Sequence, residues 1–525
     1  MTTRIRLNSV LRATGVAAFT VAALAASNVQ ADHPAGKGGK FTVHMNRDIG
    51  GFDHIRVPQG GMGRYQVIHA VNGIPFTMDD NGKLIPNLAV KLTHSDDFKV
   101  WRMTLRKGVR APNGKELTAE TYTHHFGRLL GSRLAGRFKA LLGADLQKVV
   151  ADDRYTVAFH FGRVQLAMQE LVSDGGLYIW YMNETSFAKA NENKPDYNRM
   201  SMGFGPYMVK SWIPGKGVTM VRNRNYWNPK AQHADEIFYR ITTSPEQRGL
   251  WNAMRAGDID VAWTLSGGIV NLAKKNKNLV VRQGHRKQLH FSINFQTHDN
   301  KDLADNDVRL ALSHAINRHA IIKVAMKGVQ KFADQSFPPG SKWHCDNVNY
   351  PAYDPAKAKA LLKGKNVGAI DLWTYNIPTF KKVSLMIQAM WKKVGVTANL
   401  KVAGRGPTGV VGKIVKGQTP AYMVTRGSYV HPTVFDMKMM SNAKDNEWRI
   451  KSPKLDAAIK AVQAARGDAA IKKAHCAFEK AKTEVVPYMP FGYAIAGVVH
   501  QKGIGGMKAP NDAILNYHNL YRIKK

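Results

Sequence analysis

Short stretches of alternating apolar and polar residues recur along the chain, and such alternation is typical of strands with one buried face. They cover residues 40–45, 100–105, 155–161, 370–375 and 396–402. Other segments carry apolar residues at three- and four-residue spacing, which predicts amphipathic helices. We expect helices over residues 118–130, 245–254, 307–324, 356–362, 383–394 and, with a break near Gly467, 452–483. Because short strands and helices alternate, the sequence predicts an α/β protein.

The first 31 residues have the layout of a secretory signal peptide. A basic head with Arg4, Arg6 and Arg12 precedes an apolar run over 16–26, and Ala31 closes a small-residue cleavage site. The apolar run is too short for a stable spanning helix, so cleavage is expected rather than an uncleaved anchor. Export predicts a periplasmic location, and no Cys near the cleavage point indicates a lipid anchor.

The chain has only two cysteines, Cys345 and Cys476. In an oxidising compartment these two residues are expected to form one disulfide that closes a very long loop. The alternative is a pair of unlinked buried thiols. Two cysteines far apart exclude a Cys-rich zinc site, and the sequence predicts neither a metal nor a cofactor.

The charge is strongly positive: 76 Lys and Arg against 38 Asp and Glu give a formal net charge of +38. Removal of residues 1–31, with three Arg and no acid, leaves about +35. Such a field attracts anions. The basic residues are scattered and form no block or nucleic-acid motif, so a solvated basic surface is favoured over nucleic-acid binding.

Catalytic motifs give little support to an enzyme. Residues 404–409 (GRGPTG) satisfy the dinucleotide-binding glycine pattern, but the acid required about 20 residues later is missing. Adjacent His124 and His125 would point about 100° apart on a helix and could not easily share a metal. Zinc-protease and serine-hydrolase motifs are lacking. A hydrolase with dispersed catalytic residues and a basic scavenger of anionic polymers stay open as alternatives.

An ordered series of short segments resembles the family 5 extracellular solute-binding proteins of ABC importers, which includes dipeptide-, oligopeptide- and nickel-binding members. Each segment is weakly specific alone, but together they span nearly the whole mature chain in the family's order. The segments are 82–89 (GKLIPNLA), 101–109 (WRMTLRKGV), 113–120 (NGKELTAE), 203–207 (GFGPY), 222–227 (RNRNYW), 307–318 (DVRLALSHAINR), 353–358 (YDPAKA) and 487–491 (PYMPF).

This resemblance implies a two-lobed periplasmic-binding-protein fold with a hinge between the lobes and an extra subdomain inserted in the first lobe. By position, lobe I takes residues 32–284 with the insert at 75–200, lobe II takes 285–490, and 491–525 return to lobe I. The expected function is capture of a small solute for an inner-membrane ABC permease and ATPase, without catalysis. The protein is expected to be a monomer that meets the membrane only through the permease.

The resemblance also indicates which residues face the ligand. In peptide-binding members an Asp four residues before a Pro receives the peptide's amino terminus, and alignment on Pro432 places Ser428 there. A hydroxyl cannot replace that charge, whereas nearby Arg426 could hold a carboxylate or phosphate. An anionic or carboxylate-bearing peptide-like solute is therefore expected. Further candidate contacts are Tyr429, His431, Arg47, Asp48, Trp373 and Tyr493, with core packing as the alternative for the aromatic residues.

Overall fold

The computed structural model describes residues 35–523 with several gaps. The gaps are residues 37, 58–61, 80–82, 143–144, 174–177, 243–247, 265, 299, 405, 407, 428–430, 444–445, 508–516 and 518. The predicted signal peptide and the candidate site residues Ser428 and Tyr429 lie outside the described residues.

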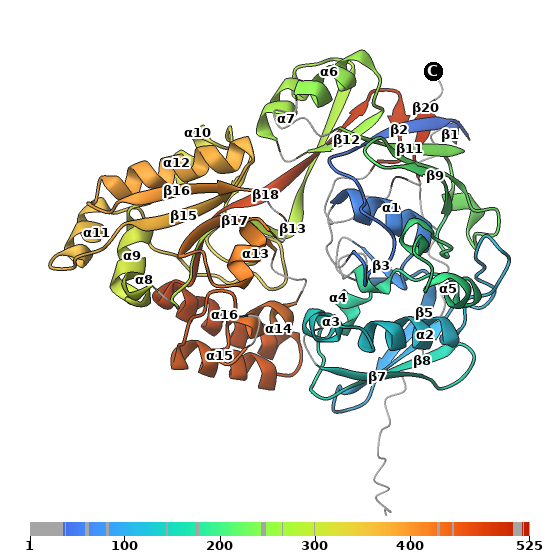
Figure 1. Ribbon diagram of the computed structural model, residues 1–525, viewed down its shortest axis with the longest axis horizontal. Coiled ribbons are helices and arrows are strands. Elements are labelled where there is room, and N and C mark those ends of the chain that lie inside the picture. Colours follow the sequence, from blue (N-terminus) through green and yellow to red (C-terminus); the bar gives the residue numbers. More distant parts are fainter. Residues whose placement is uncertain are drawn as a thin grey trace, which may run out of the picture.

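Two lobes share one large mixed sheet, and two long antiparallel strands run through both of them (Figure 1). These strands are β13 (Leu279–Phe295) and β18 (Tyr488–Gln501). Their pairing is interrupted between His285↔Ile495 and His290↔Tyr493, where β13 has four residues and β18 has one. A bulge of this kind bends the ladder locally. The interruption therefore lies where the chain passes from one lobe to the other.

Lobe I contains the first part of the sheet, in which β2 is parallel to both β11 and β12, while β12 is antiparallel to β18. Its elements are β1 (Ala35–Gly36), β2 (Lys40–Met45), α1 (Met62–Asn72), β9 (Tyr207–Ile213), β10 (Gly217–Arg222), β11 (Glu236–Ile241), α6 (Arg248–Ala256), β12 (Val261–Thr264), α7 (Gly267–Lys274), β19 (Ile504–Gly505) and β20 (Tyr521–Ile523).

A separate sheet of order β5-β6-β8-β7 packs beside lobe I, at the lower right of Figure 1. Helices α2 and α3 lie on this sheet, and the whole unit shares one hydrophobic core with lobe I. Its elements are β3 (Phe76–Met78), β4 (Leu84–Pro86), β5 (Ala89–His94), β6 (Val100–Leu105), α2 (Ala119–Leu130), α3 (Ala135–Leu142), β7 (Leu146–Ala151), β8 (Thr156–Phe161), α4 (Met168–Leu171) and α5 (Thr185–Asn191). We call this unit the insert.

Lobe II continues the large sheet in the order β16-β15-β17-β13 and has its own hydrophobic core. Its elements are α8 (Lys301–Ala304), α9 (Asn306–His314), α10 (Arg318–Val324), β14 (Lys331–Phe332), α11 (Pro355–Leu362), β15 (Ile370–Tyr375), α12 (Pro378–Lys392), β16 (Ala398–Ala403), α13 (Val410–Val415), β17 (Ala421–Gly427), α14 (Pro432–Phe435), α15 (Pro453–Ala464) and α16 (Asp468–Val485). Residues 284/285 and 490/491 remain our proposed lobe boundaries.

One predicted helix is wrong in extent. The segment 307–324 is two helices, α9 and α10, rather than one. Asn317 begins the second helix, because its side-chain oxygen accepts a hydrogen bond from the backbone N–H of Ala320 at 2.9 Å. Periodicity alone missed this N-cap, since apolar residues on both sides of the break keep helical spacing.

The segment GFGPY is explained by close packing against the end of α1. A Cβ on Gly203 would lie 2.4 Å from Asn72 Cα, and one on Gly205 would lie 2.3 Å from the carbonyl oxygen of Ala70. Only glycine permits this approach. The backbone N–H of Gly205 also donates to the carbonyl of Val71 at 2.8 Å. These glycines therefore serve the fold rather than a phosphate-binding loop.

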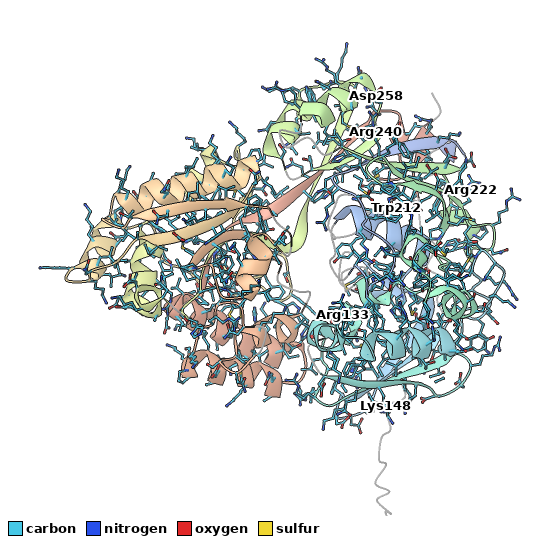
Figure 2. The ribbon with its side chains drawn as sticks, viewed as in Figure 1. Arg133, Lys148, Trp212, Arg222, Arg240 and Asp258 are labelled. Carbon is cyan, nitrogen blue, oxygen red and sulfur yellow. A yellow bond between two sulfur atoms is a disulfide. The ribbon has the colours of Figure 1, made fainter. Side chains whose placement is uncertain are left out.

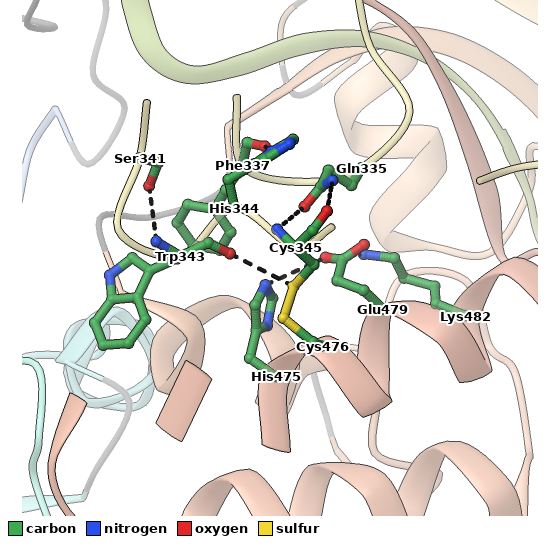
Figure 3. The surroundings of a disulfide bond; sticks show 10 residues. All are labelled: Gln335, Phe337, Ser341, Trp343, His344, Cys345, His475, Cys476, Glu479 and Lys482. Carbon is green, nitrogen blue, oxygen red and sulfur yellow. Dashed lines mark hydrogen bonds and ion pairs between the residues drawn. A yellow bond between two sulfur atoms is a disulfide. The ribbon is translucent and has the colours of Figure 1, made fainter. Parts of the chain in front are cut away.

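Cys345 and Cys476 form the predicted disulfide, with a Cα–Cα distance of 5.4 Å (Figure 3). It ties the segment 335–345 to α16. Gln335 strengthens this attachment, because its side chain accepts from the N–H of Cys345 and donates to the carbonyl of the same residue, both at 2.7 Å. The segment is thus held at both of its ends.

Replacing both cysteines by serine should lower the free energy of unfolding by about 2–5 kcal/mol, because the bridge restricts a long loop of the unfolded chain. Urea unfolding of the oxidised protein and of the C345S/C476S variant measures the difference. A reducing agent should destabilise the wild-type chain by the same amount and leave the variant unchanged. Equal stability of the two proteins would contradict the prediction.

Candidate functional site

The carboxyl ends of strands from both lobes point toward the region where the paired strands β13 and β18 pass from one lobe to the other. We call this region the crossing. β12 is antiparallel to β18, and β2 is parallel to β12, so β2 ends toward the crossing. In lobe II, β17 is antiparallel to β13 and parallel to β15, so both also end there. Segments that follow β2, β15 and β17 therefore lie at strand ends that are directed toward the other lobe, which is where ligand sites in α/β proteins usually lie.

On the lobe I side, the candidate residues Arg47 and Asp48 follow β2. Arg47 is half-buried. The Asp48 carboxylate accepts hydrogen bonds from Trp212 Nε1 at 2.9 Å and from the backbone N–H of Gly215 at 2.7 Å. Figure 2 labels Trp212, which comes from β9. Asp48 therefore fixes the segment after β2 to the hairpin formed by β9 and β10.

On the lobe II side, Arg426 is the penultimate residue of β17, and its side chain is only 9% exposed. Its guanidinium forms an ion pair with Glu447, donates from Nε to Asn294 Oδ1 at 2.8 Å and donates from Nη2 to the Tyr422 hydroxyl at 2.7 Å. It also lies 4.6 Å from the ring centroid of Trp448. These contacts hold Arg426 in one orientation just before residues 428–431. This stretch holds the candidates Ser428, Tyr429 and His431, and we call it the candidate loop.

His431 closes the candidate loop and is buried. Its ring packs edge-on against Trp343, with ring centroids 4.7 Å apart, and its Nδ1 lies 2.8 Å from Thr433 Oγ1. Burial, followed by the charge of Lys342 and that of His475, lowers the pKa of His431 to about 3. His431 is therefore neutral at physiological pH and offers no charge to a ligand.

The candidates Trp373 and Tyr493 both contact lobe II residues, although Tyr493 lies just past the proposed boundary at 490/491. Trp373 is half-buried on β15, and the Lys413 ammonium lies 4.8 Å from its ring centroid. Tyr493 is 1% exposed, and its hydroxyl lies within hydrogen-bond distance of the backbone carbonyls of Gln335, at 3.1 Å, and Phe337, at 2.9 Å. Tyr493 therefore supports the segment that carries the disulfide, which the sequence did not indicate.

A buried charge pair that sequence reasoning missed lies behind the candidate loop. Lys482 Nζ contacts Glu479 Oε1 at 2.6 Å, and it donates to the hydroxyls of Ser336 at 2.6 Å and Tyr488 at 3.0 Å. Burial alone would raise the pKa of Glu479, but the charges of Lys482 and His475 and the hydrogen bonds from Lys482 and Ser336 together outweigh burial and lower that pKa. The ring of Tyr488 stacks on Trp448 at 5.8 Å, which links this pair to the Arg426 contacts.

The lobes also touch away from the crossing, where α14 and α15 face the insert (Figure 1). Leu166 of the insert packs in a cluster with Phe337, Trp343 and Ile471 of lobe II. Lys342 lies 3.5 Å from Glu170 of the insert and 3.1 Å from Asp468. Burial raises the pKa of Glu170, and the charge of Lys342 opposes that rise. We call this contact the seam.

The segment after β2 is anchored to the insert by Asp53. Arg128 of α2 donates to both oxygens of the Asp53 carboxylate, at 2.8 and 3.0 Å, and the Asp53 side chain is 1% exposed. Burial acts to raise the pKa of Asp53, but the hydrogen bonds and charge of Arg128, together with the N–H of Ile55 and the charge of Arg56, outweigh burial and lower that pKa. Asp53 thus positions the segment that carries Arg47 and Asp48.

The Asp53→Asn substitution should destabilise the protein by about 3 kcal/mol at neutral pH, because it removes the buried carboxylate that pairs with Arg128 and leaves only Glu192 beside that arginine. A carboxyl with a lowered pKa stabilises the fold above its unfolded-state pKa of about 4, and this contribution is lost as pH falls through the folded-state pKa. The wild-type chain should therefore lose more stability than the variant between pH 5 and pH 2, measured by chemical unfolding.

The matched control is Asp152→Asn, which breaks the exposed Arg102–Asp152 pair and should cost less than about 1 kcal/mol. Equal effects of the two substitutions would contradict the anchoring role of Asp53.

The part of the chain that the structure describes contains neither a candidate metal cluster nor a candidate membrane-spanning helix. No group of three or more His, Cys, Asp or Glu side chains there could hold a metal ion. None of its helices combines the length and apolar composition needed to cross a membrane.

Comparison with solved structures agrees with the architecture described above. The chain resembles the periplasmic binding protein DppA from Helicobacter pylori in complex with the peptide STSA, with a TM-score of 0.80 and 21% identity over 93% of this chain and 99% of that one. NikA from Brucella suis in complex with Fe(III)-EDTA gives a TM-score of 0.80 and 19% identity over 92% of this chain and 100% of that one. The predicted α/β, two-lobed binding-protein fold is confirmed.

Residues 83–448 match the model of the bacterial extracellular solute-binding proteins, family 5. The chain belongs to this family, as the sequence resemblance predicted. The family consists of solute-binding proteins rather than enzymes, which supports the expected absence of catalysis.

Curated relatives share part of the chain. The dipeptide-binding protein of Escherichia coli K12 is 29% identical over 61% of this chain and 63% of its own length. The di/tripeptide-binding protein 1 of Pseudomonas aeruginosa UCBPP-PA14 is 26% identical over the same shares. The nickel-binding periplasmic protein of E. coli K12 is 28% identical over 54% of this chain and 53% of its own length. The matched region therefore spans less than two thirds of the first two relatives.

Proposed function

We propose that this protein is the periplasmic solute-binding component of an ABC importer and that it captures a small peptide-like or organic solute between its lobes. The observation that carries this proposal is that strands of both lobes end toward the crossing of β13 and β18. A ligand held there contacts both lobes, so binding favours their closure. The permease would recognise the closed form.

Export follows from the same proposal. Cleavage after Ala31 would leave a mature chain that begins at Asp32 and has a formal charge of about +35. The disulfide fits an oxidising compartment. The monomeric state and docking on the permease belong to this proposal as well.

We propose that the solute carries a carboxylate or another anionic group, with Arg426 on the lobe II side. Among the described residues, Asn294, Glu447 and Tyr422 take three of the five guanidinium N–H donors of Arg426, and we propose that the other two serve the ligand. Glu447, 25% exposed, holds the arginine in place until a ligand carboxylate approaches. Ser428 removes the acid that would repel such a ligand.

Ligand capture can be tested with the purified mature protein. Native mass spectrometry should find a small molecule carried through purification, and adding that molecule should raise the melting temperature and reduce the radius of gyration in X-ray scattering. Recovery of the molecule unchanged supports a binding protein, and its turnover would favour the exported hydrolase. A steep loss of affinity with salt would favour the scavenger of anionic polymers.

The role of Arg426 is tested with the dipeptides Ala-Ala, Ala-Glu and Ala-Lys. Arg426→Gln should weaken Ala-Glu by about tenfold relative to Ala-Ala, because a hydrogen bond to a charged group is lost. Glu447→Gln should instead strengthen Ala-Glu relative to Ala-Ala, because the arginine loses its competing carboxylate. Calorimetric titration measures both ratios. Unchanged selectivity in both variants would remove Arg426 from the ligand contacts.

A further inference from the structure

A cavity of about 330 Å³ lies at the seam between the insert and lobe II. The insert contributes Lys99, Leu142, Arg163 and Leu166, while lobe II contributes Val434 of α14 and Gln463 of α15. A volume of this size is at the lower end of the range for small-molecule sites. None of the eight predicted cleft residues lines it, but Thr433, which does, lies 2.8 Å from His431, so the cavity adjoins the candidate ligand site without sharing its residues.

The cavity combines an apolar interior with two cations at its edge. Leu142 and Val434 are buried, and Leu166 is partly buried. Lys99 and Arg163 are both exposed, and neither forms an ion pair within the described part of the chain.

No lining residue is acidic, but two carboxylates lie close to the cavity. Asp97 accepts from the Ser95 hydroxyl at 2.6 Å and from the backbone N–H of Lys99 at 3.1 Å. Asp145 lies 3.4 Å from Lys139 Nζ. Asp97 offsets part of the Lys99 charge, but within the described residues neither carboxylate forms an ion pair with Lys99 or Arg163, so both cations can meet an occupant of the cavity.

The seam contacts hold the two walls of the cavity together. Leu166 takes part in both the cavity and the seam, since it lines the cavity and packs against Phe337, Trp343 and Ile471. Lys342, which does not line the cavity, joins the walls through Glu170. The cavity is complete only while the insert and lobe II are in contact.

We propose that this seam cavity is a second binding site, which takes a small organic anion with an apolar body and stabilises contact between the lobes. The apolar part would lie against Leu142, Leu166 and Val434, and the anionic group would meet Lys99 and Arg163. Since the occupant binds only the closed arrangement, its binding free energy adds to closure of the cleft.

The probe is hexanoate, titrated into the full mature chain and followed by saturation-transfer NMR. Binding should saturate in the millimolar range, and both hexan-1-ol, which lacks the charge, and acetate, which lacks the apolar body, should bind more weakly. The K99Q/R163Q variant should weaken hexanoate by about five- to tenfold, as expected for two exposed charges. The matched control is K91Q/R240Q, which removes the same charge from exposed positions outside the cavity lining and should leave the affinity unchanged.

A third variant tests the link with closure. Lys342→Ala should weaken hexanoate without touching the cavity lining, because it loosens the seam. The proposal is overturned if hexanoate does not bind the wild-type chain, or if K99Q/R163Q and the control variant bind it equally. Equal binding by the wild type and Lys342→Ala would overturn the dependence on lobe contact. None of these outcomes depends on the dipeptide measurements, so failure here is separate from failure of the proposed cleft function.

Discussion

The antiparallel pairing of β13 with β18 is the constraint on which the rest of the structure depends. Each strand begins in one lobe and ends in the other, so a single ladder sets the position of both halves of the large sheet. At the interruption opposite Ala494 the ladder has the fewest inter-strand hydrogen bonds, so bending of the two strands meets the least resistance there. The neighbouring strands β12 and β17 pair antiparallel to β18 and β13, so the direction of the central pair determines theirs. Their carboxyl ends are therefore directed toward the other lobe, across the space between the lobes.

Lobe II supports its side of that space with buried polar contacts rather than with apolar packing alone. Arg426, Trp448, Tyr488 and Lys482 form a continuous series of ring and hydrogen-bond contacts from the candidate loop to α16. Buried polar groups whose hydrogen bonds are all formed fix one arrangement of the surrounding chain. Leaving one of these groups without its partner lowers the stability of the fold. The disulfide lies at the far end of this series and also supports the segment that meets the insert.

Much of the architecture could be predicted from the sequence, because alternation and helical spacing reflect burial on one face. The strands at 40–45, 100–105 and 370–375 and the break before α16 agree with the structure. The division of 307–324 was missed, since an N-cap such as Asn317 depends on one side-chain hydrogen bond.

The site was harder to predict than the fold. Arg426 could be noted as an unusual residue at the end of a strand, but Glu447 and Asn294, which bind it, are distant in sequence. The same holds for the pair of Lys342 and Glu170 at the seam, which no local pattern connects. Contacts between residues far apart in the chain require the three-dimensional arrangement, and these contacts determine what each candidate side chain can do.

The placement of β18 has a consequence for how the molecule assembles. In the sheet of lobe I, β12 lies between β2, near the start of the mature chain, and β18, near its end. Lobe I therefore cannot complete its sheet until nearly the whole polypeptide is available. Pairing across such a long separation is slow because the intervening chain must first be closed into a loop. A chain whose sheet is completed this late stays unfolded for longer after synthesis, which suits the export through a membrane that we propose for it.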